Sequence, residues 1–360
     1  MKTRITASLF FVFLLIIFTI PVSGQEAHGS HPSDKHEEAD EEFNPSEFIL
    51  DHVSDSHEWH IITKNNGEHV SIYLPVILYS RESGLHFFSS KKLAHGHIYK
   101  GFRLEEEGDL KGKIVSVNEN GEIDENNKPL DFSMTKTVVG MLAAALLGLV
   151  LFLTLSRSYK KTGISHPRGI QSFLEPVICF VRDDIVIPNI GPEKSAKFMP
   201  YLLSVFFFIL INNVMGIIPF PPPFGANVTG NLAVTMSLAL FTFFIIQFNG
   251  TKNYWRHIFA TPGVPFWLLP VMVPVEMIGM ISKPFALTVR LFANITAGHI
   301  IIMSLLSLIF IFDSILVSPV SILFVIFMNA LELFVAFLQA YVFTLLSALF
   351  ISLAVVDEHH

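Results

Sequence analysis

Two long and almost uncharged stretches near the C-terminus constrain the fold of this chain more than any other feature. They cover residues 264–312 and 314–356. The only Asp, Glu, Lys and Arg residues in them are Glu276, Lys283, Arg290 and Glu332. A helix of about 40 residues is about 60 Å long, roughly twice the thickness of a bilayer's hydrocarbon core. We therefore expect two long membrane helices that tilt steeply, kink or split, joined as an antiparallel hairpin by a turn at residues 313–319.

Three shorter apolar stretches complete a membrane segment of about five spans. They lie at residues 137–156, 198–218 and 232–248, each close to the ~20 residues that a spanning helix needs. The first ends in the basic string RSYKK and the third in TKNYWRH, and basic residues favour the cytoplasmic side. Residues 169–197 mix apolar and charged residues, so we expect a helix or loop on the cytoplasmic surface. This count of spans also places the C-terminus in the cytoplasm.

The composition agrees with an all-α polytopic membrane protein. Hydrophobic residues make up 51% of the chain and charged residues only 15%, against about 25% charged residues in soluble proteins. This balance excludes a soluble globular enzyme and a disordered regulator, and the net charge of -7 gives no basic footprint for nucleic acid. The single cysteine excludes an intrachain disulfide. No zinc-binding spacing occurs, so we expect no cofactor and no metal.

The N-terminal part of the chain has a different character. Residues 1–24 have a basic start, an apolar core and small residues at a cleavage site, as a secretory signal peptide does. The alternative is an uncleaved first membrane helix. Residues 25–57 are acidic and rich in histidine, which predicts a flexible arm. Metal binding by His28, His31 and His36 is an alternative that rests on composition alone.

Residues 58–132 are expected to form a small β-rich domain, before a membrane domain at residues 133–360. The strings HVSIYLPVIL, HIYKGFRL and GKIVSV are typical of strands, and NENGE of a hairpin turn. Residues 25–136 contain 22 acidic and 11 basic residues, and no catalytic constellation. A signal peptide before them and a basic end after the first span predict that this region lies outside the cytoplasmic membrane.

The charged residues inside the apolar stretches are functional candidates, because ionisable groups are costly in a bilayer. At about 100° per residue, Glu276 and Lys283 lie within about 40° of Arg290 on one helix face, and Asn294 follows one turn later. A snorkelling position at a helix break is the alternative for Lys283. Arg290 has apolar residues on both sides, which makes that alternative unsuitable for it.

An antiparallel pairing of the two long helices predicts two polar paths. With Arg290 level with Gln339, His299 and Glu332 reach similar depths on the outward side, and His299 faces about 180° away from Arg290. Histidine and glutamate can pass protons, whereas arginine stays charged. The pattern indicates a device that admits protons from each side but not straight through.

The strings SKPFALTVRLFANITAGHI and LELFVAFLQAYVFTLLSALFISLA resemble subunit a of the F-type ATP synthase. The similarity covers about residues 125–360, so it says nothing of the β-rich region. It implies that Arg290 faces the carboxylate of the rotating c-ring, with Asn294 and Gln339 beside it. Glu276 matches the cytoplasmic half-channel, and His299 and Glu332 match the other half-channel. Polar channel residues of the family fall at Asn212 and Asn213.

The resemblance implies a non-catalytic subunit that couples proton flow to rotary ATP synthesis in a bacterial inner membrane. Its implied partners are the c-ring, the peripheral-stalk b subunits, the lipid bilayer and the transported proton. A self-contained secondary transporter is the alternative function, and it would usually show an inverted repeat with matching broken helices. The sequence leaves open whether protons or sodium ions are carried.

Overall fold

Among the residues that the structure describes, five helices are long and apolar enough to cross a membrane. The computed structural model describes residues 45–63, 69–106, 108–118, 120–124, 127–162, 169–218, 221–260, 265–312 and 317–355. The expected signal peptide, and with it His28, His31 and His36, lies outside the described residues. The five helices confirm a polytopic, mostly helical membrane protein with a small β-rich region at its N-terminal side.

The membrane helices follow the expected order. They are α3 (Lys136–Thr162), α6 (Pro192–Ile217), α7 (Leu232–Asn249), α9 (Leu269–Phe312) and α10 (Val317–Val355). Helix α6 begins six residues before the expected span at residue 198. Pro192 fits the first turn because its missing N–H would have no partner there, and Glu193 in that turn complements the helix dipole.

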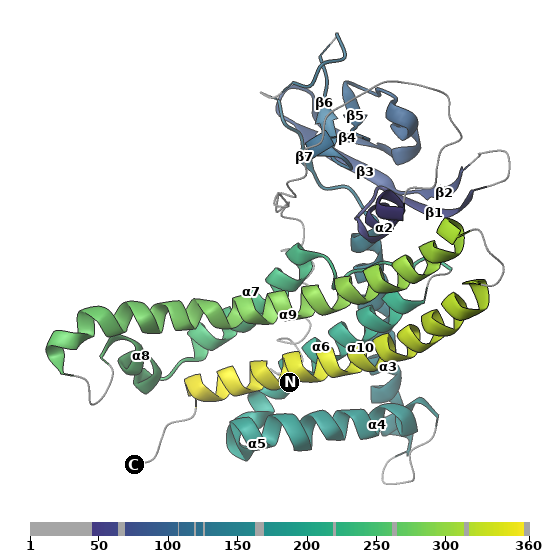
Figure 1. Ribbon diagram of the computed structural model, residues 1–360. Coiled ribbons are helices and arrows are strands. Elements are labelled where there is room, and N and C mark those ends of the chain that lie inside the picture. The colour runs from purple at the N-terminus through teal and green to yellow at the C-terminus, as the bar shows by residue number, and fades with distance from the viewer. Residues whose placement is uncertain are drawn as a thin grey trace.

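Helices α9 and α10 form the tilted hairpin that their length requires. They contain 44 and 39 residues, far more than an upright helix needs to cross ~30 Å of hydrocarbon. In Figure 1 they run side by side across the direction of α3 rather than along it. Helix α9 packs against α10 and α7, and α10 packs against α6. The expected antiparallel hairpin is confirmed.

A proline-rich segment separates α6 from α7. Gly225 has a φ of 79°, which favours glycine, and its N–H donates to the carbonyl oxygen of Met215 at 3.0 Å. Asn231 then caps α7, because its side chain accepts a hydrogen bond from the N–H of Ala233 at 2.9 Å. The chain therefore turns back tightly onto the end of α6.

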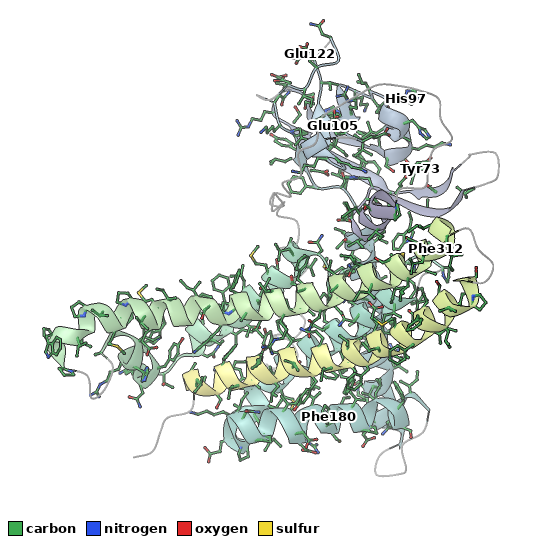
Figure 2. All side chains as sticks on the ribbon, in the orientation of Figure 1. Tyr73, His97, Glu105, Glu122, Phe180 and Phe312 are labelled. Atoms are coloured by element: carbon green, nitrogen blue, oxygen red, sulfur yellow. The ribbon has the colours of Figure 1, made fainter. Side chains whose placement is uncertain are left out.

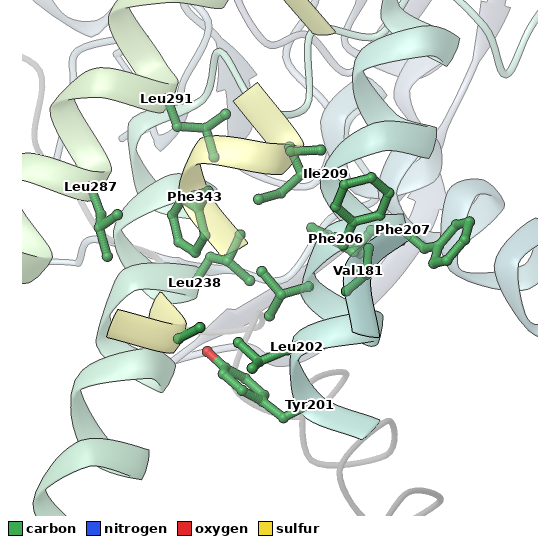
Figure 3. Close-up of a cluster of buried hydrophobic side chains, with 14 of the residues drawn as sticks. Val181, Tyr201, Leu202, Phe206, Phe207, Ile209, Leu238, Leu287, Leu291 and Phe343 are labelled. Atoms are coloured by element: carbon green, nitrogen blue, oxygen red, sulfur yellow. The ribbon is translucent and has the colours of Figure 1, made fainter. Parts of the chain in front are cut away.

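The core of the membrane domain gathers around α6. Figure 3 shows Phe206 and Ile209 of α6 near Phe343 of α10, with Leu238 of α7 and Leu291 of α9 in the same cluster. On α10 the fully buried small residues are Ala336, Ala340, Ala348 and Ala354. Small residues at helix interfaces let backbones approach closely in membranes, which explains the close packing of α10 on α6.

A surface layer packs along α10. It consists of α4 (Ile170–Phe180), a π-helical turn η4 (Val181–Val186) and α5 (Ile187–Ile190), which lie on the side of α10 opposite α9 in Figure 1. Two hydrogen bonds tie it and the start of α6 to the end of α10: Ser352 Oγ donates to Asn189 O, and Lys194 Nζ donates to Val355 O. The surface helix expected within residues 169–197 is thus present.

The N-terminal region contains seven short strands. They are β1 (Glu58–Thr63), β2 (His69–Tyr73), β3 (Pro75–Ser80), β4 (Gly84–Ser89), β5 (Phe102–Leu104), β6 (Ile114–Ser116) and β7 (Leu130–Asp131). They pair antiparallel as β1-β2, β4-β3-β7 and β5-β6. Three 3-10 turns lie between them, at η1 (Ser90–Lys92), η2 (Ala94–Gly96) and η3 (Gly108–Leu110). A separate core joins the sheets, formed by Val76, Leu78, Phe88, Leu93, Phe102 and Ile114.

Backbone hydrogen bonds attach this domain to the first turn of α3. The Lys136 N–H donates to Ser56 O at 2.8 Å, and the Thr137 N–H donates to Asp55 Oδ1 at 3.0 Å. Trp59 joins the core cluster of the membrane domain. Helix α2 (Pro45–Val53) packs against α9, so the last part of the range expected to be a flexible arm is helical and has a tertiary partner.

A buried histidine supports the same junction. Its ring nitrogen Nε2 lies 3.2 Å from Asp131 Oδ2, and the side chain of His57 is only 7% exposed. Burial by itself would raise the pKa of Asp131, but the hydrogen bonds from His57 and Ser133 outweigh it and lower this pKa below its usual value. The carboxylate form of Asp131 is therefore the form that the folded junction stabilises.

This shift predicts a loss of stability in acid. Because the pKa of Asp131 is lower in the folded chain, its contribution is complete above the usual pKa of about 4 and is lost as the pH falls through the folded value. Hydrogen bonds to charged groups contribute about 1.5–3 kcal/mol and those between neutral groups about 0.5–1.5 kcal/mol. We therefore expect Asp131→Asn to lower the free energy of unfolding by about 1 kcal/mol at neutral pH. The acid-dependent loss should also become smaller in this variant.

Urea unfolding from pH 3 to pH 7 would measure this, with Trp59 as the fluorescent probe after Trp255→Phe and Trp267→Phe. Glu122→Gln, at an exposed turn residue, is the matched control and should keep the pH profile of the parent chain. An Asp131→Asn profile as steep as that of the parent chain would contradict the role given to this carboxylate.

Candidate functional site

The polar residues of α9 lie on two different faces. The buried face carries Leu287, Leu291 and Ile295 at intervals of four residues, and the next position in this series is His299. All four are at most 9% exposed. Arg290 lies on the exposed face. The separation expected from the helical period is therefore present: the histidine points into the protein and the arginine points out of it.

The buried face brings His299 to Glu332. His299 Nδ1 lies 2.6 Å from Glu332 Oε1, and the two side chains are 10% and 5% exposed. The ring nitrogen makes its hydrogen bond to Ile295 O at 3.2 Å, so the carboxylate approaches the same nitrogen from another direction, as an ion-pair contact. The two residues expected at a similar depth on neighbouring helices are in contact across α9 and α10.

Two glycines leave room for this pair. A Cβ atom added to Gly298 would lie 3.0 Å from Glu332 Oε1, and a Cβ added to Gly216 of α6 would lie 3.8 Å from His299 Nε2. The carboxylate therefore lies directly against the backbone of α9, and the far side of the imidazole faces α6. Sequence reasoning missed both glycines, although Gly298 immediately precedes the candidate histidine.

The amides of α6 extend the polar region. Thr229 Oγ1 donates to Asn213 Oδ1 at 2.5 Å, and Asn213 Nδ2 donates to Ala336 O of α10 at 3.4 Å. Asn212 is 1% exposed, and its Nδ2 donates to Phe208 O, whereas its Oδ1 has no partner among the described residues. Both asparagines singled out in the sequence are thus buried, and Thr229 joins them as a residue that the sequence did not indicate.

A second link joins α9 and α10 near Arg290. Asn294 Nδ2 donates to Gln339 Oε1 at 3.0 Å, and Gln339 is 3% exposed. The Nε2 of Gln339 has no hydrogen-bond partner within the described part of the chain. Asn294 and Gln339 are close together, as expected. The Nε2 of Gln339 is left as an amide donor beside the exposed face of the hairpin.

Arg290 lies in an apolar and exposed surface. Among the residues that the structure describes, none forms an ion pair or hydrogen bond with its guanidinium. Exposed apolar side chains lie near its level along the two helices, including Phe285, Val289 and Leu338. Ionisable groups inside a membrane are usually paired, which makes Arg290 a candidate functional residue.

The other two charged residues of α9 lie towards its N-terminal end. Lys283 Nζ is 5.5 Å from the centre of the Phe350 ring, and it lines a small pocket together with Gln247, Tyr254 and Met280. Glu276 is half-buried. They do not contact the His299–Glu332 pair, so the structure divides the predicted residues into two groups along the hairpin.

Tyr254 and Gln247 join the second group, and the sequence had not indicated either of them. Gln247 Nε2 donates to Tyr254 Oη at 3.3 Å, and Gln247 Oε1 is buried without a partner among the described residues. Burial raises the pKa of the Tyr254 hydroxyl, and the nearby Glu276 carboxylate raises it further. Tyr254 belongs to α8 (Lys252–Phe259), a short helix that follows α7. In the sequence, its position within the basic string TKNYWRH is the one signal that could have indicated it.

Comparisons with known protein families match two separate parts of the chain. Residues 138–352 match the family described as ATP synthase A chain. Residues 48–132 match a family described as a domain of unknown function, and this range contains all seven described strands.

The chain is similar to several proteins named ATP synthase subunit a. The chain is 50% identical over 238 residues to ATP synthase subunit a of Myxococcus xanthus, covering 64% of this chain and 76% of that protein. It is 46% identical over 236 residues to ATP synthase subunit a of Chloroherpeton thalassium, covering 64% and 69%. It is 49% identical over 238 residues to ATP synthase subunit a 2 of Chlorobaculum tepidum, covering 64% and 66%.

The two glycines of α9 allow a test of the packing around Glu332. Replacing glycine by alanine inside a helix usually stabilises by roughly 0.5–1 kcal/mol. Gly279→Ala should show this gain, because nothing lies within 4 Å of the added Cβ. Gly298→Ala should lose it, because its Cβ at 3.0 Å from Glu332 Oε1 forces the carboxylate to move. Equal midpoints of detergent-induced unfolding for the two variants would contradict the close contact between Gly298 and Glu332.

Proposed function

The chain belongs to the ATP synthase subunit a family, and we propose that it forms two half-channels to the c-ring carboxylate, separated by Arg290. As a member of this family it is a multi-pass membrane subunit of the ATP synthase. One observation carries the proposal. The His299–Glu332 pair is buried between α9 and α10, whereas Arg290 is exposed on the opposite face of α9. A proton-passing pair and a permanent cation thus occupy separate sides of one helix.

The outward half-channel is assigned to the buried polar region of α6, α9 and α10. An imidazole and a carboxylate can each bind and release a proton, and the two side chains are in contact, with His299 Nδ1 2.6 Å from Glu332 Oε1. Asn213 and Thr229 provide further hydrogen-bonding groups on the side of α6. The free Oδ1 of Asn212 provides an acceptor in an otherwise apolar core. These groups offer a path that does not touch Arg290.

In this proposal Arg290 blocks direct proton passage between the half-channels and attracts the ring carboxylate. Its guanidinium, with a pKa above ~12, cannot relay protons but attracts the deprotonated carboxylate of a passing ring subunit. The exposed apolar surface around Arg290 suits contact with apolar ring helices, and the amide pair Asn294–Gln339 holds the two long helices together beside it.

The inward half-channel is assigned to the N-terminal part of α9. Glu276 is its titratable group, and Lys283, Gln247 and Tyr254 line the neighbouring pocket. Basic residues at the end of α3, in RSYKK, and in α8, in TKNYWRH, favour a cytoplasmic position for this end of the protein. The N-terminal domain is then external and the C-terminus cytoplasmic. The peripheral-stalk b subunits are expected as further partners.

A self-contained secondary transporter remains the alternative function. It would usually have two matching halves with broken helices at a shared site, whereas the five described spans include one long hairpin without a counterpart. Purifying the chain from its native membrane separates the two functions. We expect a ring of small two-helix subunits to co-purify with it, and isolation of a transport-active chain without such a ring would favour the transporter.

Arg290 is predicted to be indispensable. Arg290→Lys should abolish ATP-driven proton pumping in inverted vesicles, because an ammonium offers a different geometry from a guanidinium and can lose its proton when buried. Arg290→Ala should abolish pumping as well. Arg157→Lys, at the exposed end of α3, is the matched control and should pump normally. Normal pumping by Arg290→Lys would show that the barrier lies elsewhere.

The buried pair is predicted to work as one unit. His299→Ala and Glu332→Gln should each slow proton pumping, because each removes one titratable partner. The exchange of both residues, His299→Glu with Glu332→His, should pump faster than either single exchange, since it restores one imidazole and one carboxylate at the contact. Asn329→Ala, one turn before Glu332, is a control whose side chain bonds only to Val325 O of its own helix. A double exchange no faster than the slower single exchange would contradict the pairing.

A further inference from the structure

One face of the sheet β4-β3-β7 consists of apolar side chains. Residues that pair across antiparallel strands point to the same face, and Tyr79 pairs with both Leu85 and Leu130. Ile77 pairs with Phe87, and its carbonyl accepts a hydrogen bond from the Phe132 N–H at 2.9 Å. The Met134 N–H donates in the same way to Pro75 O at 3.0 Å. We name these residues the apolar sheet face: Pro75, Ile77, Tyr79, Leu85, Phe87, Leu130, Phe132 and Met134.

This face is not covered by the rest of the chain that the structure describes. Leu85 and Phe87 are 69% and 68% exposed, and Tyr79, Leu130 and Phe132 are at least 40% exposed. The opposite face of the same strands supplies Val76, Leu78 and Phe88 to the domain core. An antiparallel sheet with one face in water usually alternates apolar and polar residues. An apolar patch of this kind marks an interaction surface.

The apolar sheet face continues into the first membrane span. Met134 lies two residues before Lys136, where α3 begins. The exposed apolar side chains of α3, a helix long and apolar enough to cross a membrane, include Leu146, Leu149, Val150 and Leu153. Hydrogen bonds from Lys136 and Thr137 to Ser56 and Asp55 fix the domain to this helix. The sheet therefore begins at the membrane surface and has little freedom to move away from it.

The strands of the domain lie at different distances from the membrane helices. In Figure 1, β3 runs across the direction of α3, and β5 and β6 lie farther from the membrane helices than β3 does. Figure 2 places the polar residues His97, Glu105 and Glu122 on the part of the domain away from the helices. β5 and β6 pack on the other face of the sheet through the domain core, so the apolar sheet face is the one turned away from them.

The residues of the face suit a lipid surface. Aromatic side chains such as Tyr79, Phe87 and Phe132 are typical of the layer between headgroups and hydrocarbon. Lys91 is exposed directly after β4, at the end of the sheet that pairs with Pro75 and Met134, whereas Lys92 Nζ bonds to Tyr99 Oη at 2.8 Å. Basic residues near a bilayer surface attract lipid phosphates. We propose that the apolar sheet face lies in the interfacial layer of the bilayer, so that lipid holds the domain in place together with α3.

Spin-label accessibility in the full chain tests this proposal. The single cysteine, Cys179, allows a Cys179→Ser background with one new cysteine at a time. Leu85→Cys and Phe87→Cys label the apolar sheet face. Ile98→Cys is the matched control, because Ile98 is also apolar, is 51% exposed and adjoins His97 on the far part of the domain. The chain is reconstituted in vesicles of phosphatidylethanolamine and phosphatidylglycerol, and collisions with oxygen and with a water-soluble nickel chelate are compared.

We expect oxygen collisions to exceed nickel collisions several-fold at positions 85 and 87, and the reverse at position 98. Equal access of the nickel chelate to all three positions would overturn the proposal, because the face would then lie in water. Protection of positions 85 and 87 from both reagents in the assembled complex, with nickel access in the isolated chain, would also overturn it and assign the face to a protein partner. Labels at Tyr79 and Leu130 repeat the measurement, so that one poorly folded variant cannot decide the outcome.

Discussion

The length of α9 and α10 relative to the bilayer determines how the rest of the membrane domain is built. Helices of 44 and 39 residues fit a hydrocarbon core of ~30 Å only when they tilt steeply. A tilted hairpin leaves its flanks open, and α6, α7 and the α4–η4–α5 layer pack against them. The alanines of α10 permit the closest of these contacts. Because the two helices are tilted, their polar residues lie within the membrane together with the apolar ones.

The two faces of α9 have different physical requirements. His299 can be buried because Glu332 is beside it and Gly298 and Gly216 leave space for the pair. Arg290, on the exposed face, has no such partner within the described residues. Ionisable groups inside a membrane are usually paired, and the proposed function gives Arg290 a partner on another molecule. The contrast between a paired, buried group and an unpaired, exposed cation is what favours a partner-facing role for Arg290.

The N-terminal domain is joined to the membrane domain by more than a linker. Asp55 and Ser56 accept hydrogen bonds from the first turn of α3, Trp59 packs into the membrane-domain core, and α2 contacts α9. The buried pair of His57 and Asp131 lies close to the same junction. Such an attachment fixes the direction of the domain's apolar sheet face, which a flexible tether would leave undetermined.

The five spans could be predicted from the amino-acid sequence, because hydropathy over some twenty residues depends on the solvent and not on neighbouring helices. The helical period also placed His299 opposite Arg290, and the antiparallel hairpin placed it near Glu332. Tertiary structure alone decided the partners contributed by distant segments. Thr229 meets Asn213, Tyr254 lies near Glu276, and α2 packs on α9. No local pattern encodes these contacts, because they depend on how tilted helices and a separate domain meet in space.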